Sequence, residues 1–269
     1  MGGTKRYATI MVEAHGAIEV VTLDRPGALN ALSNELVGEL LDYVQGLRQR
    51  PECRVVLLRG NGRAFCAGLD IKEHRSATNE TPLQRAWRVQ IALSDLLKAM
   101  RAAPQPFIAL GHGAACGGGF SLMLASDVRF GAPSLRMNAA YIRIGLGGAD
   151  IGSSYFLPRL IGASLAAELL LTGRFLDADR ALRLGLLSDV VPEEHLLETG
   201  LALADEMVAN APYGLSLTKQ ALNLAIDAPS LEAALALEDR QQVMLQATDD
   251  HHEAMTAFVE KRPPVYHGR

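Results

Sequence analysis

The sequence predicts an α/β fold with a helical C-terminal region, and three observations support this prediction. Segments with strand character alternate with helical segments up to about residue 193 of the 269-residue chain. The apolar run RVVLLRG at residues 54–60 is continuous, as in a parallel strand that is buried on both faces. Beyond residue 193 the strand signals stop and only helical patterns follow. Alternating strands and helices favour a sheet with largely parallel pairing.

The first elements follow from apolar spacing and from turn residues. Residues 18–23, IEVVTL, form a predicted strand that ends at the turn DRP at residues 24–26. A helix is expected next, because Ser33 is a suitable N-cap and apolar residues then recur at helical spacing. These residues are Leu36, Leu40, Val44 and Leu47, with Val37 and Leu41 beside them. The buried strand at residues 54–60 follows, and then the loop NGRAFCAGLDIKE at residues 61–73.

The remaining elements complete the alternation and then end it. The segments expected up to residue 140 are a helix at 87–100, strands at 107–113, 127–132 and 134–140, and a helix that begins at the glycines 117–119. The helical patterns near the end of the chain lie at residues 193–211, 213–227, 230–247 and 249–262. Pro212 and Pro229 separate successive helices there. We therefore expect an α/β body over residues 1–195 and a helical region over residues 196–269.

The composition argues against several function classes. The formal net charge is −4 and the sequence pI is near 6.0, so no basic field is available for nucleic acid or an anionic membrane. No run of 18 apolar residues predicts a membrane span, and the N-terminal residues lack the apolar core of a signal peptide, so we expect a cytoplasmic protein. The three cysteines are widely spaced and no H-E-x-x-H pattern occurs, which predicts reduced thiols and no metal site.

The segment GAACGGGFSLMLASDV at residues 113–128 places adjacent glycines at the start of an apolar helix. Each glycine destabilises a helix by up to about 1 kcal/mol relative to alanine, so adjacent glycines at this position indicate a specific structural or functional requirement. One reason is a ligand that approaches the unpaired N–H groups of the helix N-terminus. The other is tight packing of the helix against a strand. The glycine patterns typical of nucleotide-phosphate sites are absent, so a phosphate cradle of those kinds is not supported.

Further glycine-containing segments point to a known family. RPGALNALS, GNGRAFCAGLDIKE, GHGAACGGGFSLMLASDVRFGA and RIGLGGADIGSSYFLPRLIG occur in this order, and together they resemble the crotonase superfamily, the enoyl-CoA hydratase/isomerase family. The resemblance extends from about residue 9 to residue 262. It implies a crotonase-like spiral of repeated β-β-α units, with C-terminal helices that build a homotrimer or a hexamer. It also implies a coenzyme A thioester as the substrate, with no permanently bound cofactor.

The resemblance assigns roles to individual residues. The family's oxyanion-hole amides correspond here to the backbone N–H groups of Leu69 and Gly118. Two such fixed donors would stabilise the negative charge that develops on a thioester oxygen when an enolate forms. The positions that correspond to coenzyme A contacts are Arg25, Leu29, Ala67, Asp70 and Ile71, together with Phe258 and Lys261, which would reach the coenzyme A of a neighbouring subunit. For Arg25 and Lys261 a plain solvent-exposed charge is the alternative.

The sequence departs from the family pattern at the residues that catalyse the addition of water in the hydratases. The two glutamates that activate water in the hydratases correspond here to Ser121 and Tyr141, and neither is a carboxylate. Asp150, in GLGGADIGSSYF, is similar to an aspartate of the dienoyl-CoA isomerases, although the block is one residue longer here. Asp150 is therefore either a base or the N-cap of the helix that follows it.

These departures favour proton transfer of the isomerase type, with Asp150 as the base, over efficient hydration. The alternatives are thioester hydrolysis, decarboxylation or dehalogenation on the same fold, or acyl-CoA binding without turnover.

Overall fold

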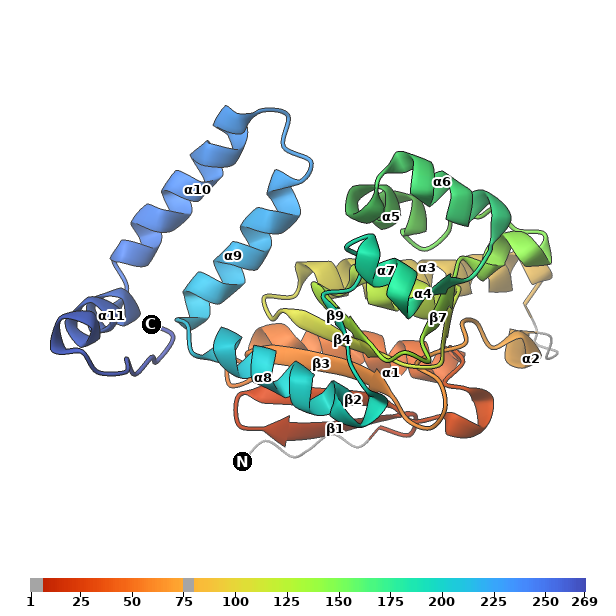
Figure 1. Cartoon of the computed structure of the whole chain (residues 1–269), viewed down its shortest axis with the longest axis horizontal. Coiled ribbons are helices and arrows are strands. Elements are labelled where there is room, and N and C mark those ends of the chain that lie inside the picture. The colour runs from red at the N-terminus through yellow and green to blue at the C-terminus, as the bar shows by residue number, and fades with distance from the viewer. Residues whose placement is uncertain (1–6, 75–79) are drawn as a thin grey trace.

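The computed structural model describes residues 7–74 and 80–269 and contains two sheets (Figure 1). In this described part the larger sheet has the strand order β1-β2-β3-β4-β6-β9, in which β1 and β2 are antiparallel and every other neighbouring pair is parallel. Its strands are β1 (Ile10–His15), β2 (Ile18–Leu23), β3 (Val55–Gly60), β4 (Phe107–Gly111), β6 (Val128–Gly131) and β9 (Asp189–Val190).

The smaller sheet is built from short strands, two of which directly follow strands of the larger one. It has the order β5-β7-β8 within the described residues, with β5 (Ala114–Cys116) parallel to β7 (Arg136–Asn138) and β8 (Leu176–Asp177) antiparallel to β7. The chain passes from β4 to β5 and then into helix α4 (Gly118–Ala125), and from β6 to β7 and then into short helical turns. This repeated β-β-α course is the spiral that the family resemblance implied.

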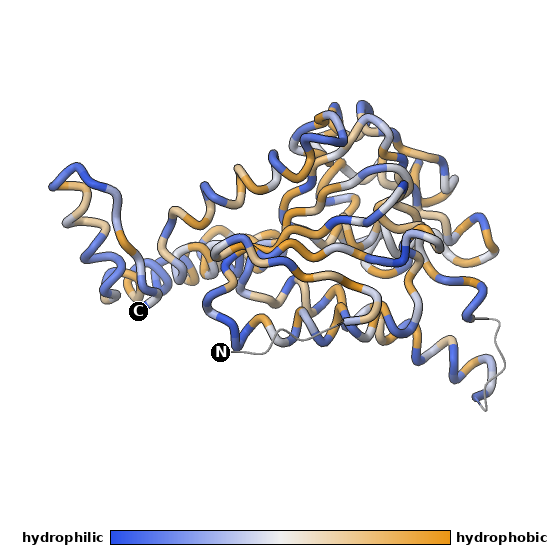
Figure 2. Tube along the Cα trace, turned by 90° about the horizontal axis from the view of Figure 1, so that it is seen from below, coloured by the Kyte–Doolittle hydropathy of each residue, from blue (hydrophilic) through white to orange (hydrophobic). Residues whose placement is uncertain are grey.

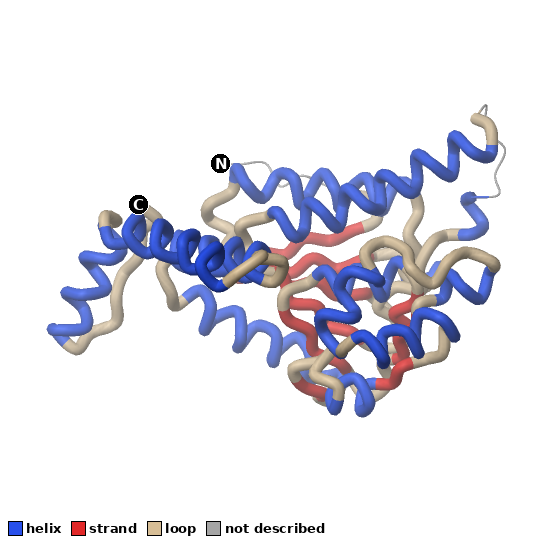
Figure 3. Tube along the Cα trace, turned by 90° about the horizontal axis from the view of Figure 1, so that it is seen from above, coloured by secondary structure: helices blue, strands red, loops and turns tan. Residues whose placement is uncertain are grey.

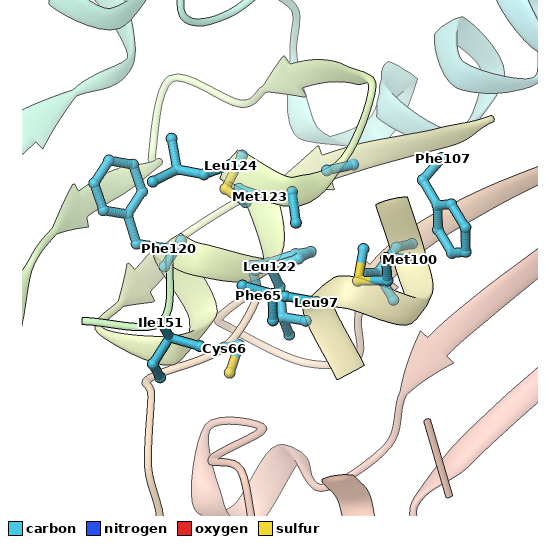
Figure 4. Packing of buried hydrophobic residues seen from close by; sticks show 14 of the residues in the cluster. Phe65, Cys66, Leu97, Met100, Phe107, Phe120, Leu122, Met123, Leu124 and Ile151 are labelled. Carbon is cyan, nitrogen blue, oxygen red and sulfur yellow. The ribbon is translucent and has the colours of Figure 1, made fainter. Parts of the chain in front are cut away.

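Helices cover both faces of the larger sheet, which explains the continuous apolar run in β3. Val56 and Leu58 belong to a core cluster with α1 (Asn34–Gly46), α3 (Pro82–Ala102) and α4. The intervening Val55 and Leu57 belong to a second cluster with α8 (Leu196–Val208). Side chains alternate across a strand, so a strand covered on both faces is apolar at every position. Figure 3 shows the strands enclosed by helices, and Figure 4 shows part of the larger cluster around α4.

Most elements expected up to residue 140 occur as predicted. Ser33 is the N-cap of α1, and its Oγ accepts from the N–H of Leu36 at 3.1 Å. The strand β1 was not predicted, because its alternate residues are exposed at the edge of the sheet and include Glu13 and His15. The short elements between residues 163 and 190 were also not predicted. They are α6 (Ala163–Thr172), α7 (Ala178–Arg183), β8 and β9, and they follow α5 (Ser153–Ile161).

The C-terminal helices divide into one that packs on the sheet and others that project from it. α8 packs on the sheet through Gly200 and Ala204, and α9 (Pro212–Ala225), α10 (Leu231–Gln246) and α11 (Asp249–Glu260) extend away from the body (Figure 1). Hydrophobic positions recur along these projecting helices (Figure 2). Those that are exposed in the single chain include Leu222, Leu224, Leu235, Val243, Met244 and Phe258. Among the described residues no helix has both the length and the apolarity needed to cross a membrane.

Buried Lys219 joins α9 to the body. Its Nζ donates to the carbonyl oxygens of Met100 at 2.9 Å and Gln105 at 2.8 Å, and it lies 3.0 Å from a carboxylate oxygen of Asp127. Asp127 also accepts from Arg101 and from the N–H of Phe107. Burial lowers the pKa of Lys219 against the opposing effect of Asp127, so these partners compensate a costly buried charge.

Candidate active site

The loop that carries Leu69 is held by a short parallel ladder to the loop after β2. The N–H of Leu32 donates to the oxygen of Gly68 at 2.7 Å, and the N–H of Asp70 donates to the oxygen of Leu32 at 3.0 Å. In such a ladder the residue between the two bonded positions directs its own N–H to the opposite side. The N–H of Leu69 therefore points away from this loop, and no acceptor for it occurs within residues 7–74 and 80–269.

Each of the three glycines at the start of α4 has its own structural reason. Gly117 is the N-cap, with φ +50° and ψ −119°, a conformation that side chains disfavour. A Cβ on Gly119 would lie 2.1 Å from the carbonyl oxygen of Cys66, so the helix and that loop touch backbone to backbone. A Cβ on Gly118 would meet only side chains, with the Cδ1 of Leu32 at 2.6 Å. Backbone conformation therefore accounts for Gly117, and tight packing accounts for Gly119, without a ligand.

The turns that carry the two candidate amides lie against each other. A Cβ built on Gly68 would lie 3.6 Å from the backbone nitrogen of Gly118, and Gly68 directly precedes Leu69. The N–H of Gly118 is in the first turn of α4, and the described residues offer it no acceptor. A helix N-terminus carries a partial positive charge as well as unpaired donors. The two neighbouring amides can therefore interact with a partly negative oxygen.

Ser121 and Tyr141 form a buried hydroxyl pair behind this helix start. Ser121 lies on α4, Tyr141 lies on the short helix η3 (Ala140–Ile144), and their oxygens are 2.7 Å apart. Both side chains are buried, and burial raises the pKa of Tyr141 well above its usual value. The phenol is therefore neutral at physiological pH and is bonded to the serine. The charge of Asp150 raises the pKa of Tyr141 further. Asp150 is connected to this region through Ile151, whose Cδ1 lies 3.7 Å from the position of a Cβ on Gly118, in the helix that carries Ser121.

Asp150 is not the N-cap of the following helix, and that alternative is wrong. The N-cap of α5 is Gly152, with φ +76° and no side-chain capping bond. Asp150 lies two residues earlier, and its Oδ1 accepts from the N–H of Ile151 at 2.8 Å. The same oxygen accepts from Nε2 of Gln90, on α3, at 2.5 Å. The carboxylate is partly exposed, so it is accessible from outside the protein.

Most of the residues expected to contact coenzyme A surround the same pair of loops. Arg25 donates to Asp70 at 2.9 Å, and Ala67 donates through its N–H to the oxygen of Leu29 at 3.0 Å. Burial opposes ionisation of Asp70, but hydrogen bonds from Arg25 and nearby N–H groups hold the pKa of Asp70 below its usual range. Ile71 begins the short helix α2 (Ile71–His74) and is 55% exposed. Among the described residues, Ile71 is therefore an apolar side chain left largely exposed beside these loops.

Phe258 and Lys261 are not brought to this site within one chain. Both lie at the end of α11, in the projecting part of the molecule (Figure 1), and the Phe258 side chain is 82% exposed. Sequence reasoning also missed Gln90, which contacts Asp150. A lone glutamine in a predicted helix has no pattern that marks it, and only the packing of α3 near residue 150 shows its position.

Comparisons with known proteins agree with the fold. A family model described as enoyl-CoA hydratase/isomerase matches residues 13–269. A probable enoyl-CoA hydratase of Mycobacterium tuberculosis is 36% identical over 275 residues, which cover 99% of this chain and 95% of that protein. The short-chain-enoyl-CoA hydratase of Clostridium acetobutylicum is 33% identical, covering 94% and 95%. The crystal structure of an enoyl-CoA hydratase from Bacillus anthracis superposes with a TM-score of 0.92 at 32% identity, covering 97% of this chain and 100% of that one.

Proposed function

This chain belongs to the enoyl-CoA hydratase/isomerase family, and on that premise we propose that it moves a double bond in an enoyl- or dienoyl-CoA thioester. The reaction is a proton transfer, with Asp150 as the base that removes a proton from a carbon of the acyl chain. One observation carries the proposal. Ser121 and Tyr141, which correspond by resemblance to the hydratase glutamates, are hydrogen-bonded to each other, and Ile151, the residue after Asp150, packs at the start of the helix that carries Ser121.

The enolate formed by this step is stabilised by two backbone donors. The N–H groups of Leu69 and Gly118 both donate to the thioester oxygen, and their neighbouring turns support this role. Because both donors are fixed before the substrate binds, they need no reorganisation when charge develops. One donor of this kind contributes about 10²–10³ in rate.

Hydration by the two-glutamate route is disfavoured by the chemistry of the hydroxyl pair. Activation of water needs a group that accepts a proton near neutral pH, and such a group contributes about 10²–10⁴ in rate. Ser121 has no suitable pKa, and burial keeps Tyr141 protonated. In the proposed enzyme this pair forms a polar wall of the pocket.

Coenzyme A binds across the loops that carry Arg25, Leu29, Ala67, Asp70 and Ile71, and no permanently bound cofactor is needed. The proposed assembly is a homotrimer, or a hexamer of two trimers, in which Phe258 and Lys261 reach the coenzyme A of a neighbouring subunit. The exposed apolar positions of α9–α11 support such an assembly. Lys261 would act as a point charge toward a phosphate. We propose the cytoplasm as the place of action.

The test is to incubate the protein at high concentration with enoyl- and dienoyl-CoA thioesters in heavy water. Deuterium uptake and a shift of the double bond are expected, and Asp150→Asn should slow both by about 10²–10⁴, to a residual rate that remains measurable at high enzyme concentration. No uptake and no shift in the wild-type protein would overturn the proposal, whereas full activity of Asp150→Asn would overturn only the choice of base.

A second candidate is acyl-CoA binding without turnover, which the mutually satisfied Ser121–Tyr141 pair favours. Tight binding with no change in a broad panel of thioesters would support it. Release of free coenzyme A, carbon dioxide or halide would indicate hydrolysis, decarboxylation or dehalogenation instead.

A further inference from the structure

The two carboxylate oxygens of Asp150 have different surroundings. Oδ1 accepts from Nε2 of Gln90 at 2.5 Å and from the N–H of Ile151 at 2.8 Å. Within residues 7–74 and 80–269, no donor is bonded to Oδ2. A carboxylate accepts a proton most readily at the oxygen whose lone pairs are free. The structure therefore distinguishes an oxygen that is held from an oxygen that can take a proton.

The position of Gln90 is fixed by the helix that carries it. Its neighbours Val89 and Leu93 on α3 are buried in the larger core cluster, while Gln90 itself is exposed toward Asp150. The N-terminus of α3 is fixed by a capping box between Thr81 and Gln84. Because an ionised carboxylate only accepts hydrogen bonds, the amide NH₂ of Gln90 must face it. This hydrogen bond connects α3 to the loop before α5.

The second donor is presented by an unusual backbone conformation. Ile151 has φ +42°, which is disfavoured for a β-branched residue, and its side chain is buried. Its Cδ1 lies 3.7 Å from the position of a Cβ on Gly118, so this side chain packs at the start of α4. The same residue therefore contacts the proposed oxyanion site through its side chain and orients Asp150 through its N–H.

We propose that Gln90 is a positioning residue that, with the N–H of Ile151, holds Oδ1 of Asp150 and so presents Oδ2 to the substrate carbon. This inference rests on the proposed function, because it assigns the proton-accepting atom of the same reaction. Gln90 takes no proton itself. The proton removed from the acyl carbon moves to Oδ2, and the electron pair enters the thioester enolate.

The experiment is a double-mutant cycle with Gln90→Met and Asp150→Asn, with deuterium incorporation into enoyl-CoA in heavy water as the readout. Methionine keeps the length of glutamine and removes the donor. A hydrogen bond to a charged group predicts a kcat about 10- to 100-fold lower for Gln90→Met, with KM changed less than about twofold. In the Asp150→Asn background the same substitution should cost less than about twofold, because the two residues act as one unit. Equal losses in both backgrounds, or a change in KM alone, would overturn the inference.

Gln45→Met is the matched control, since Gln45 is an exposed glutamine on α1 to which the described residues offer no side-chain hydrogen bond. Its activity should equal that of the wild type. If the wild-type protein exchanges no deuterium, the proposed function fails, and crystal structures then test the positioning alone. In Gln90→Met the Asp150 carboxylate should leave its 2.8 Å contact with the N–H of Ile151. An unchanged carboxylate in that variant would show that Gln90 does not position it.

Discussion

Replacing Gly119 by alanine should disturb both folding and catalysis, because the structure leaves no room for the added methyl group. The new Cβ would lie 2.1 Å from the carbonyl oxygen of Cys66 and 2.9 Å from its carbonyl carbon. Backbone atoms cannot turn aside as a side chain can, so the start of α4 must move by about 1 Å to reach an ordinary contact. Overpacking of this kind costs about 1–3 kcal/mol.

The same movement separates the N–H of Gly118 from that of Leu69. Loss of one oxyanion donor predicts a kcat about 10²–10³ lower, beyond the loss of stability. Thermal unfolding should show a decrease of about 2–12 °C, taking about 2–4 °C for each kcal/mol in a chain of this size. The rate of deuterium incorporation into the substrate, measured well below the unfolding temperature, gives the loss of kcat separately from the loss of stability.

Gly118→Ala is the control for this prediction. Its Cβ would meet Cδ1 of Leu32 at 2.6 Å, the end of a flexible side chain that can rotate away. We expect the smaller loss of stability for Gly118→Ala. The reasoning is refuted if Gly119→Ala unfolds at the wild-type temperature, or if Gly118→Ala is the less stable of the two.

Further predictions concern the anchor of α9, the buried thiols and the loop ion pair. Lys219→Met should destabilise the protein by about 3 kcal/mol, because it leaves Asp127 and two carbonyl oxygens without their donor, and urea unfolding would measure this. Burial raises the pKa of the thiols of Cys53 and Cys66 to about 12, so iodoacetamide at pH 8 should modify neither in the folded protein and both in denaturant, as peptide mass spectrometry would show. The pKa of Asp70 is lower in the folded protein than in the unfolded chain. The Arg25–Asp70 ion pair therefore stabilises the fold at pH values above the unfolded-state pKa of Asp70, and this stabilisation is lost as the pH falls through the folded-state pKa. Removing its partner Arg25 should therefore lower the melting temperature slightly at pH 7 and have little effect near pH 2, and a melting series across this pH range would show whether the difference persists.

Local patterns predicted the elements that local chemistry determines. Ser33 and the apolar stripe after it predicted α1, and the continuous apolar run predicted the buried strand β3. The edge strand β1 exposes polar residues such as Glu13, so its sequence carries a weak signal. β8 and β9 have two residues each and are defined by their partners in the sheets rather than by a pattern of their own.

The site was harder to predict because its geometry depends on contacts between distant segments. Asp150 looked like a possible N-cap, but Ile151 and Gly152 adopt positive φ and delay the start of α5. Position 119 needs glycine because the carbonyl group of Cys66, 53 residues earlier in the chain, lies against it. The contact of Gln90 with Asp150 spans 60 residues. No local pattern encodes such distances.

A crystal structure of the protein with a bound, unreactive acyl-CoA thioester would test the central claim most directly. We predict that the thioester oxygen lies within hydrogen-bond distance of the backbone nitrogens of both Leu69 and Gly118, with Oδ2 of Asp150 facing the acyl chain. A thioester oxygen bound by neither amide, or an acyl chain directed away from Asp150, would contradict the account.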